Sequence, residues 1–129
     1  MSQCLGLRGA TTADANTERD IVGATEELLK ELVAANDLAE SDVAAIFFTT
    51  TTDLNAEFPA VAARVRMGWE QTALMNGCEI AVPGATESVV RVMLLVNTDK
   101  SKDELVHVYL KGAKNLRIRG RRNDDVHAL

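Results

Sequence analysis

The chain has 129 residues, of which 47% are hydrophobic and 26% are charged, and its formal net charge is −5 at pH 7. This is the composition of one globular domain, and the negative charge argues against a nucleic-acid partner because phosphate neutralisation requires a basic surface. Uninterrupted apolar runs such as VMLLV are far shorter than the roughly 20 residues of a membrane span. With two cysteines outside any zinc spacing and no apolar leader, the sequence predicts a cytoplasmic protein without membrane association.

The first half of the chain predicts a strand, a helix and a second strand. Residues 3–12, QCLGLRGATT, alternate weakly between apolar and polar positions and predict the first strand. Apolar residues then recur at helical spacing from Thr17, which forms a loose capping box with Asp20, to about Asn36. Residues 43–52, VAAIFFTTTT, are rich in β-branched and aromatic side chains and predict a buried second strand.

The second half predicts one short helix followed mostly by strands. Pro59 stands where the first turn of a helix tolerates proline, and a short helix is expected over residues 60–67. The extended pieces that follow are expected at 70–75, within 76–82 after a turn, at 89–98 and at 106–110.

This order of elements favours an α+β or mixed α/β domain with a single mixed sheet covered by one main helix. One helix covers only one face, and the other face must meet water or another subunit. Residues 89–96, VVRVMLLV, are apolar on both alternating faces, which favours another subunit. We expect residues 1–117 to form a single domain and residues 118–129 to form a basic, flexible tail.

Arg91 interrupts the most apolar strand of the chain with a permanent positive charge. Burying a lone guanidinium costs several kcal/mol unless an anion meets it, so either the chain or a ligand must supply that anion. Glu79 opens the apolar piece EIAV and is the candidate partner within the chain. The sequence pattern alone is equally compatible with an internal ion pair between these two residues and with a ligand site.

Other residues carry weaker signals. The two histidines, His107 and His127, have no ligand-spaced partner, and we expect no metal site. Taken alone, arginines such as Arg8 and Arg64 are usually solvated, and Tyr109 and Cys78 are usually buried core residues. The tail segment RIRGRR is basic, but NDD follows at once, so nucleic-acid binding there is a distant alternative.

Several stretches together resemble one family: LRGATT, DLNAEFPAVAAR, CEIAVPGATESVVRVMLLVNT, and HVYLKGA followed by NLR. They resemble the small monofunctional chorismate mutases of the aroH class, known from Bacillus, over about Leu5 to Arg117. The resemblance implies a bacterial homotrimer that forms a pseudo-α/β barrel with its active sites between subunits. It also implies the cofactor-free pericyclic (Claisen) rearrangement of chorismate to prephenate, in the shikimate pathway to phenylalanine and tyrosine.

The resemblance also implies roles for particular residues. Arg91 matches the cation that meets the negative charge growing on the ether oxygen in the transition state. Arg8 would bind a substrate carboxylate, and Glu79 would accept a hydrogen bond from the substrate hydroxyl. The other substrate-binding positions implied are Phe58, Arg64, Asn76, Tyr109, Leu116 and Arg117.

The chain departs from the family pattern at two positions. The family usually has cysteine or serine three residues before the glutamate, where this chain has Asn76, and a cysteine stands instead at Cys78. A lysine that is common in the short helix is Val61 here, which removes one cation from the pocket entrance.

Two other functions fit parts of the same pattern. A trimeric imine or enamine deaminase shares a related barrel and also holds a carboxylate with arginine. A non-catalytic module could bind a metabolite of the aromatic pathway without turnover. The spacing of Glu79 and Arg91 around EIAVPGATESVVR favours the mutase.

Overall fold

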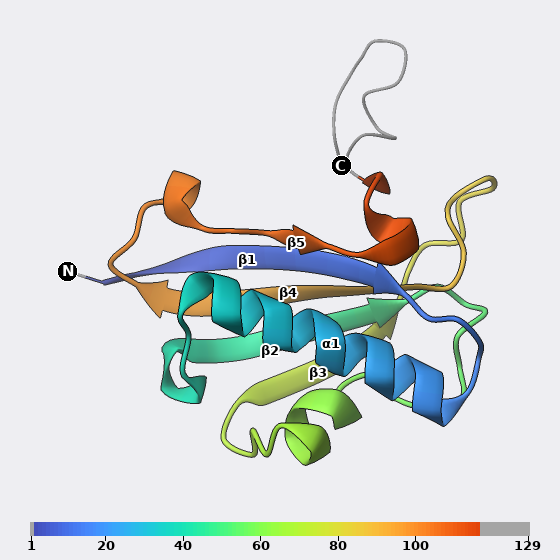
Figure 1. Ribbon diagram of the computed structural model, residues 1–129, viewed down its shortest axis with the longest axis horizontal. Helices are drawn as coiled ribbons and strands as arrows, with labels where there is room; N and C mark the ends of the chain where they lie inside the picture. The colour runs from blue at the N-terminus through green and yellow to red at the C-terminus, as the bar shows by residue number, and fades with distance from the viewer. Residues whose placement is uncertain (1, 117–129) are drawn as a thin grey trace, which may run out of the picture.

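A computed structural model describes residues 2–116, in which one helix crosses one face of a five-stranded sheet (Figure 1). Arg117 and the predicted tail at 118–129 lie outside the described residues. The strands and the main helix are β1 (Gln3–Thr12), α1 (Glu18–Asn36), β2 (Val43–Thr50), β3 (Ala73–Cys78), β4 (Val89–Thr98) and β5 (Val108–Tyr109). The short helical turns are η1 (Glu40–Asp42), η2 (Ala62–Arg66), η3 (Lys102–Glu104) and η4 (Lys111–Ala113).

The sheet has the strand order β3-β2-β4-β1-β5 and is mixed. The central strand β4 runs antiparallel to both β1 and β2, while the edge strands β3 and β5 run parallel to β2 and β1. The prediction of a single mixed sheet with one main helix is therefore confirmed. Within residues 2–116, no helix combines the length and apolar character needed to cross a membrane.

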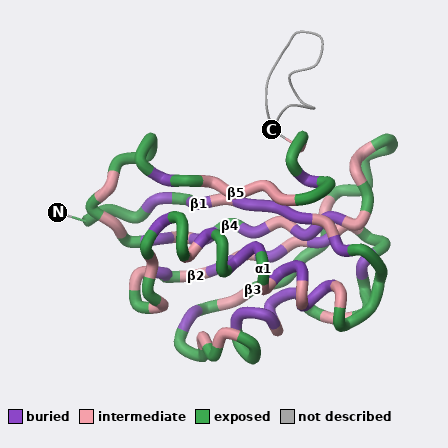
Figure 2. Tube along the Cα trace, viewed as in Figure 1, coloured by how far each residue is buried: buried purple, intermediate pink, exposed green. Residues whose placement is uncertain are grey.

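The helix α1 is defined by its ends and by one apolar stripe. Thr17 caps its start, with Oγ1 accepting a hydrogen bond from Asp20 N at 3.1 Å, and Asp37 ends it in the left-handed conformation. Leu28, Leu29 and Leu32 are completely buried between helix and sheet. Full burial of each such side chain contributes about 1.5–3 kcal/mol, so this stripe holds α1 on the sheet (Figure 2).

At Gly9, the strand β1 lies close to both α1 and β5. A Cβ at this position would stand 2.7 Å from Val108 O and 3.0 Å from a methyl group of Leu32. Only glycine lets the edge strand β5 and the helix approach β1 this closely.

The region around β3 differs from its prediction. The strand spans Ala73–Cys78 instead of 70–75, and residues 76–78 pair with β2 where the sequence predicted a turn. The backbone pairing offered by the buried strand β2 outweighs the local turn preference of Asn76-Gly77. Because β3 is an edge strand, Cys78 is exposed, and the expectation of a buried thiol is wrong.

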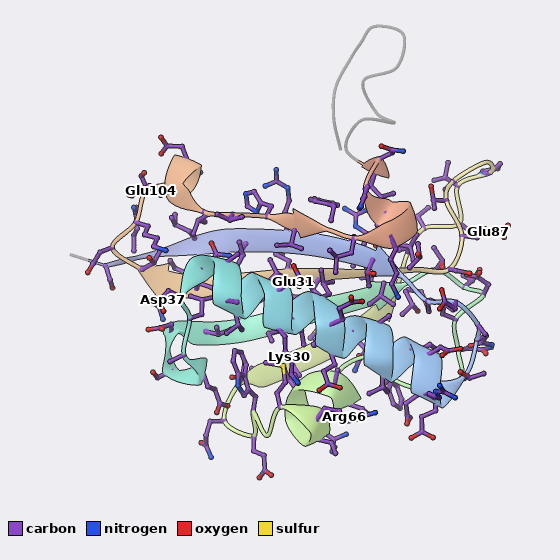
Figure 3. All side chains as sticks on the ribbon, in the orientation of Figure 1. Lys30, Glu31, Asp37, Arg66, Glu87 and Glu104 are labelled. Atoms are coloured by element: carbon purple, nitrogen blue, oxygen red, sulfur yellow. The ribbon has the colours of Figure 1, made fainter. Side chains whose placement is uncertain are left out.

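An ion-pair cluster joins α1 to η2. Glu26 on α1 lies 2.7 Å from Lys30 Nζ and 3.3 Å from Arg66 Nη1 on η2. Lys30 and Arg66 are labelled on α1 and η2 in Figure 3. The hydrogen bond from Lys30 is the main cause that lowers the pKa of Glu26 below its ordinary value. The cluster holds η2, which carries Arg64, against the helix.

Candidate active site

The sheet face that points away from α1 is called the open face. On β4, the side chains of Val90, Val92 and Leu94 are buried toward the helix, whereas Arg91 and Met93 alternate with them on the open face. Arg91 lies opposite Ala10 of β1 and Thr49 of β2, so it stands near the middle of the sheet.

Arg91 and Glu79 form an ion pair on the open face. Arg91 Nε lies 3.6 Å from Glu79 Oε2, and the side chains are 39% and 25% exposed. Thr49 Oγ1 donates a hydrogen bond to the same carboxylate oxygen. Glu79 directly follows β3, where its backbone N–H donates to Thr50 O at 2.8 Å. The chain therefore supplies an anion to Arg91, but at a position that solvent or a ligand can reach.

Arg8 lies on the same face, on β1 opposite Met93. Its Nη1 is 2.9 Å from His107 Nε2, and its backbone N–H lies 3.1 Å from His107 Nδ1. Its buried Nε has no hydrogen-bond partner among the described residues. A buried cationic donor without an acceptor is costly, so the site has unused capacity for an anion.

These side chains surround one hollow of about 300 Å³, a volume at the small end of the range for ligand pockets. A neighbouring hollow of about 330 Å³ shares Glu79 and Arg91 and extends to Leu116. Tyr109 and Leu116 pack against the same small cluster of buried side chains. The residues lining the first hollow are Arg8, Gly9, Phe47, Thr49, Glu79, Arg91, Val92, Met93 and Tyr109.

The remaining predicted residues lie elsewhere. Phe58 and Asn76 line a separate hollow of about 300 Å³ beside the edge strand β3, and Arg64 is exposed on η2. Asn76 Oδ1 accepts a hydrogen bond from Ala60 N at 3.1 Å. Val61 packs partly buried against the core, at the position where the family has a lysine. Within one chain, the predicted site residues thus fall into two groups. The first group lines the hollow around Arg91, and the second group consists of Phe58, Arg64 and Asn76.

The loop between β3 and β4, residues 79–88, borders the first group and is anchored at its far end. Asp53 Oδ2 accepts hydrogen bonds from Ser88 N at 3.0 Å and Ser88 Oγ at 3.1 Å. Hydrogen bonds from Thr51 and Ser88 lower the pKa of Asp53 below its ordinary value, against a smaller opposing effect of burial. The anchor holds Ser88 at a positive φ of 59°.

Sequence reasoning missed two residues, Thr49 and His107. His107 stands two positions before Tyr109, and the two-residue period of a strand could have indicated that they share a face. The contact between Thr49 and Glu79 depends on how β3 pairs with β2. No pattern in the sequence indicates this contact. Within residues 2–116, no three His, Cys, Asp or Glu side chains gather at metal-binding distance.

The arrangement offers two arginines and one carboxylate over a shared hollow, which suits an anionic ligand that also carries a hydrogen-bond donor. The family model for chorismate mutase type I matches residues 4–119. The chain is 42% identical over 113 residues to the chorismate mutase AroH of Thermus thermophilus, covering 87% of this chain and 92% of that protein. It is 38% identical over 112 residues to the chorismate mutase AroH of Bacillus subtilis strain 168, covering 87% and 88%.

A solved structure shows the same fold. The chorismate mutase from Clostridium thermocellum superimposes with a TM-score of 0.85 at 54% sequence identity. The match covers 87% of this chain and 99% of that one.

Proposed function

The chain belongs to the type I chorismate mutase family and is an enzyme that isomerises chorismate; from this premise we propose that the reaction takes place over the open face of the sheet. The product is prephenate, formed by a cofactor-free pericyclic rearrangement on the route to phenylalanine and tyrosine. One C–O ether bond breaks while one C–C bond forms within the same molecule, and no proton is exchanged with the protein.

Arg91 is the residue on which the proposal chiefly depends. Negative charge develops on the ether oxygen as the C–O bond breaks, and a fixed cation there stabilises the transition state more than the ground state. The single observation that carries this role is its position beside Glu79 on the central strand, facing a hollow. Arginine suits it because the guanidinium keeps its charge and presents a planar fork.

The neighbouring residues bind and orient the substrate. Arg8 receives a carboxylate, which gives its unpartnered Nε an acceptor. Glu79 accepts the hydrogen bond of the substrate hydroxyl, and Tyr109 donates its own hydroxyl near a carboxylate. Holding a flexible dianion in its compact reactive shape supplies a further part of the rate acceleration.

We further propose that the complete site forms between subunits of a homotrimer in the cytoplasm. Phe58, Arg64 and Asn76 lie outside the hollow that contains Arg91, so a neighbouring copy is needed to unite the two groups. The open face also presents large apolar side chains: Met75 is 62% exposed and Met93 is 45% exposed. These side chains favour a contact with another copy over contact with water.

A turnover assay tests the reaction. Purified protein should consume chorismate and release prephenate at a rate that is nearly constant across neutral pH, because no group must gain or lose a proton. A sharp optimum near pH 7, or hydrolysis of an imine substrate in place of chorismate turnover, would favour the deaminase. Tight binding of chorismate without product would favour a binding module.

Mixing two inactive variants tests the shared site. Arg91→Ala and Arg64→Ala remove one residue from each group, so each homotrimer should be impaired at every site. When the two are unfolded and refolded together at equal amounts, about a quarter of all sites should carry both arginines and regain activity. Recovery no greater than the sum of the separate variants, or a monomer in sedimentation, would contradict the shared site.

A further inference from the structure

The imidazole of His107 lies between two donors of the same residue. Nδ1 is 3.1 Å from the backbone N–H of Arg8, and Nε2 is 2.9 Å from Nη1 of its guanidinium. A neutral imidazole has one acceptor nitrogen, since the other carries the proton. The ring therefore accepts a hydrogen bond from only one of the two groups at a time.

We propose that His107 is a positioning residue, which accepts a hydrogen bond from the Arg8 guanidinium and orients it toward a carboxylate of the substrate. The inference rests on the proposed function of Arg8. Nε2 is assigned as the acceptor because a hydrogen bond from a charged donor is roughly twice as strong as one from a neutral donor. The contact to Nη1 is also the shorter of the two.

The orientation of Arg8 decides which edge of the guanidinium meets the substrate. With Nη1 held by His107, the edge formed by Nε and Nη2 remains for a carboxylate, which a guanidinium binds best through two parallel hydrogen bonds. Nε is the atom that has no partner among the described residues. A long arginine side chain without this contact would lose rotamer freedom on binding the substrate, which weakens binding.

His107 is itself held on both sides. The buried Asn36 of α1 accepts a hydrogen bond from Val106 N at 2.8 Å and donates one to Val106 O at 2.9 Å. On the other side, Val108 pairs with Gly9 of β1. A residue that orients another must have a fixed backbone, and the helix and the sheet provide one for His107.

Glutamine and asparagine substitutions at position 107 distinguish a role in orienting Arg8 from a purely structural role. Glutamine places its side-chain oxygen near the position of Nε2 and can still serve the guanidinium, whereas asparagine reaches only as far as Nδ1 and can serve the backbone N–H. His107→Ala should raise KM for chorismate about tenfold, as expected for loss of one charged hydrogen bond, with a smaller change in kcat. His107→Gln should restore KM to within a few-fold of wild type, and His107→Asn should not.

The same assay contains its controls. In an Arg8→Ala background, His107→Ala should raise KM no further, because its effect acts through Arg8. Rescue by asparagine but not by glutamine, or a full additional loss in the Arg8→Ala background, would overturn the proposal. Wild-type turnover in these measurements tests the reaction itself, so failure of the proposed function is recognised separately.

A measurement that leaves His107 and Arg8 unchanged covers the case in which the variants do not fold. The chain has only two histidines, His107 and His127, so nitrogen NMR of the imidazoles can be assigned with one His127 substitution. The proposal expects the unprotonated nitrogen of His107 to be Nε2. An unprotonated Nδ1 would mean that the ring serves the backbone of Arg8 and that the proposal is wrong.

Discussion

The covered face and the open face of the sheet are built from the same strands but from different chemistry. On β4, Val90 and Leu94 are completely buried under α1, while Arg91 between them is partly exposed on the opposite side. The strand geometry alone produces this alternation. The covered face thus holds the backbone in place, and the open face presents charged groups from a rigid support.

The two faces should also differ in what they contribute. Burial under α1 stabilises the fold, whereas a partly exposed ion pair such as Arg91–Glu79 contributes about 0–1 kcal/mol. Substitutions on the open face should therefore change chemistry and spare stability. Substitutions on the covered face should lower stability and leave the chemistry nearly unchanged.

Substitution of Arg91 on the open face should have the strongest effect on activity. Arg91→Ala should lower kcat/KM about 10²–10³-fold, as is typical when one preorganised donor is lost, while the melting temperature changes little. Arg91→Lys is the matched control, since it keeps the charge but loses the planar fork and should remain impaired. An Arg91→Ala protein that unfolds, with normal activity in the fraction that stays folded, would show that the ion pair is purely structural.

On the covered face, Leu94→Ala should cost about 2–5 kcal/mol of the free energy of unfolding, because the surrounding core only partly fills the cavity. Leu94 is completely buried beneath α1. Urea unfolding measures the loss, and kcat/KM under strongly folding conditions should stay within a few-fold of wild type. A large loss of activity without a change in stability would contradict the division between the faces.

Gly9 links the two faces, because it lies on the covered face yet supports β5, which carries Tyr109. Gly9→Ala should destabilise the protein by about 1–3 kcal/mol, since its Cβ would stand 2.7 Å from Val108 O. Gly23→Ala on α1 is the matched control. Its Cβ meets nothing within 4 Å, and the helix should gain about 0.5–1 kcal/mol. If thermal unfolding shows that both variants are stabilised, or that both are destabilised, the result would contradict the close approach at Gly9.

The smallest effect concerns the anchor of the loop at residues 79–88. The pKa of Asp53 is lowered in the folded state, so the stability it contributes is present above the unfolded pKa and is lost as pH falls through the folded value. Asp53→Asn should be slightly less stable than wild type at pH 6, and the difference should narrow below about pH 4. Urea unfolding measures the difference in the free energy of unfolding between wild type and Asp53→Asn. If this difference is unchanged from pH 6 to pH 3, the carboxylate charge does not hold the loop.

Prediction from sequence succeeded where a local pattern coincides with a structural period. The bounds of β1 and β4, the cap at Thr17 and the end of α1 follow from alternation and helical spacing. The end of β3 could not be predicted from these patterns, because Asn-Gly is a turn signal and only pairing with β2 extends the strand to Cys78. The resemblance proposed Arg8, Glu79, Arg91 and Tyr109 together, and these four side chains do line one hollow. Their individual roles stay predictions.

The amino-acid sequence is enough to locate the charge within an apolar strand, the start and end of the main helix, and the family resemblance. These properties depend on neighbours along the chain. The contacts of Thr49 and His107 with the site residues become visible only in the folded chain, as does the separation of Phe58, Arg64 and Asn76 from that site. Those relations depend on strand order and register, which bring together residues 30 and 99 positions apart, and no local pattern encodes such distances.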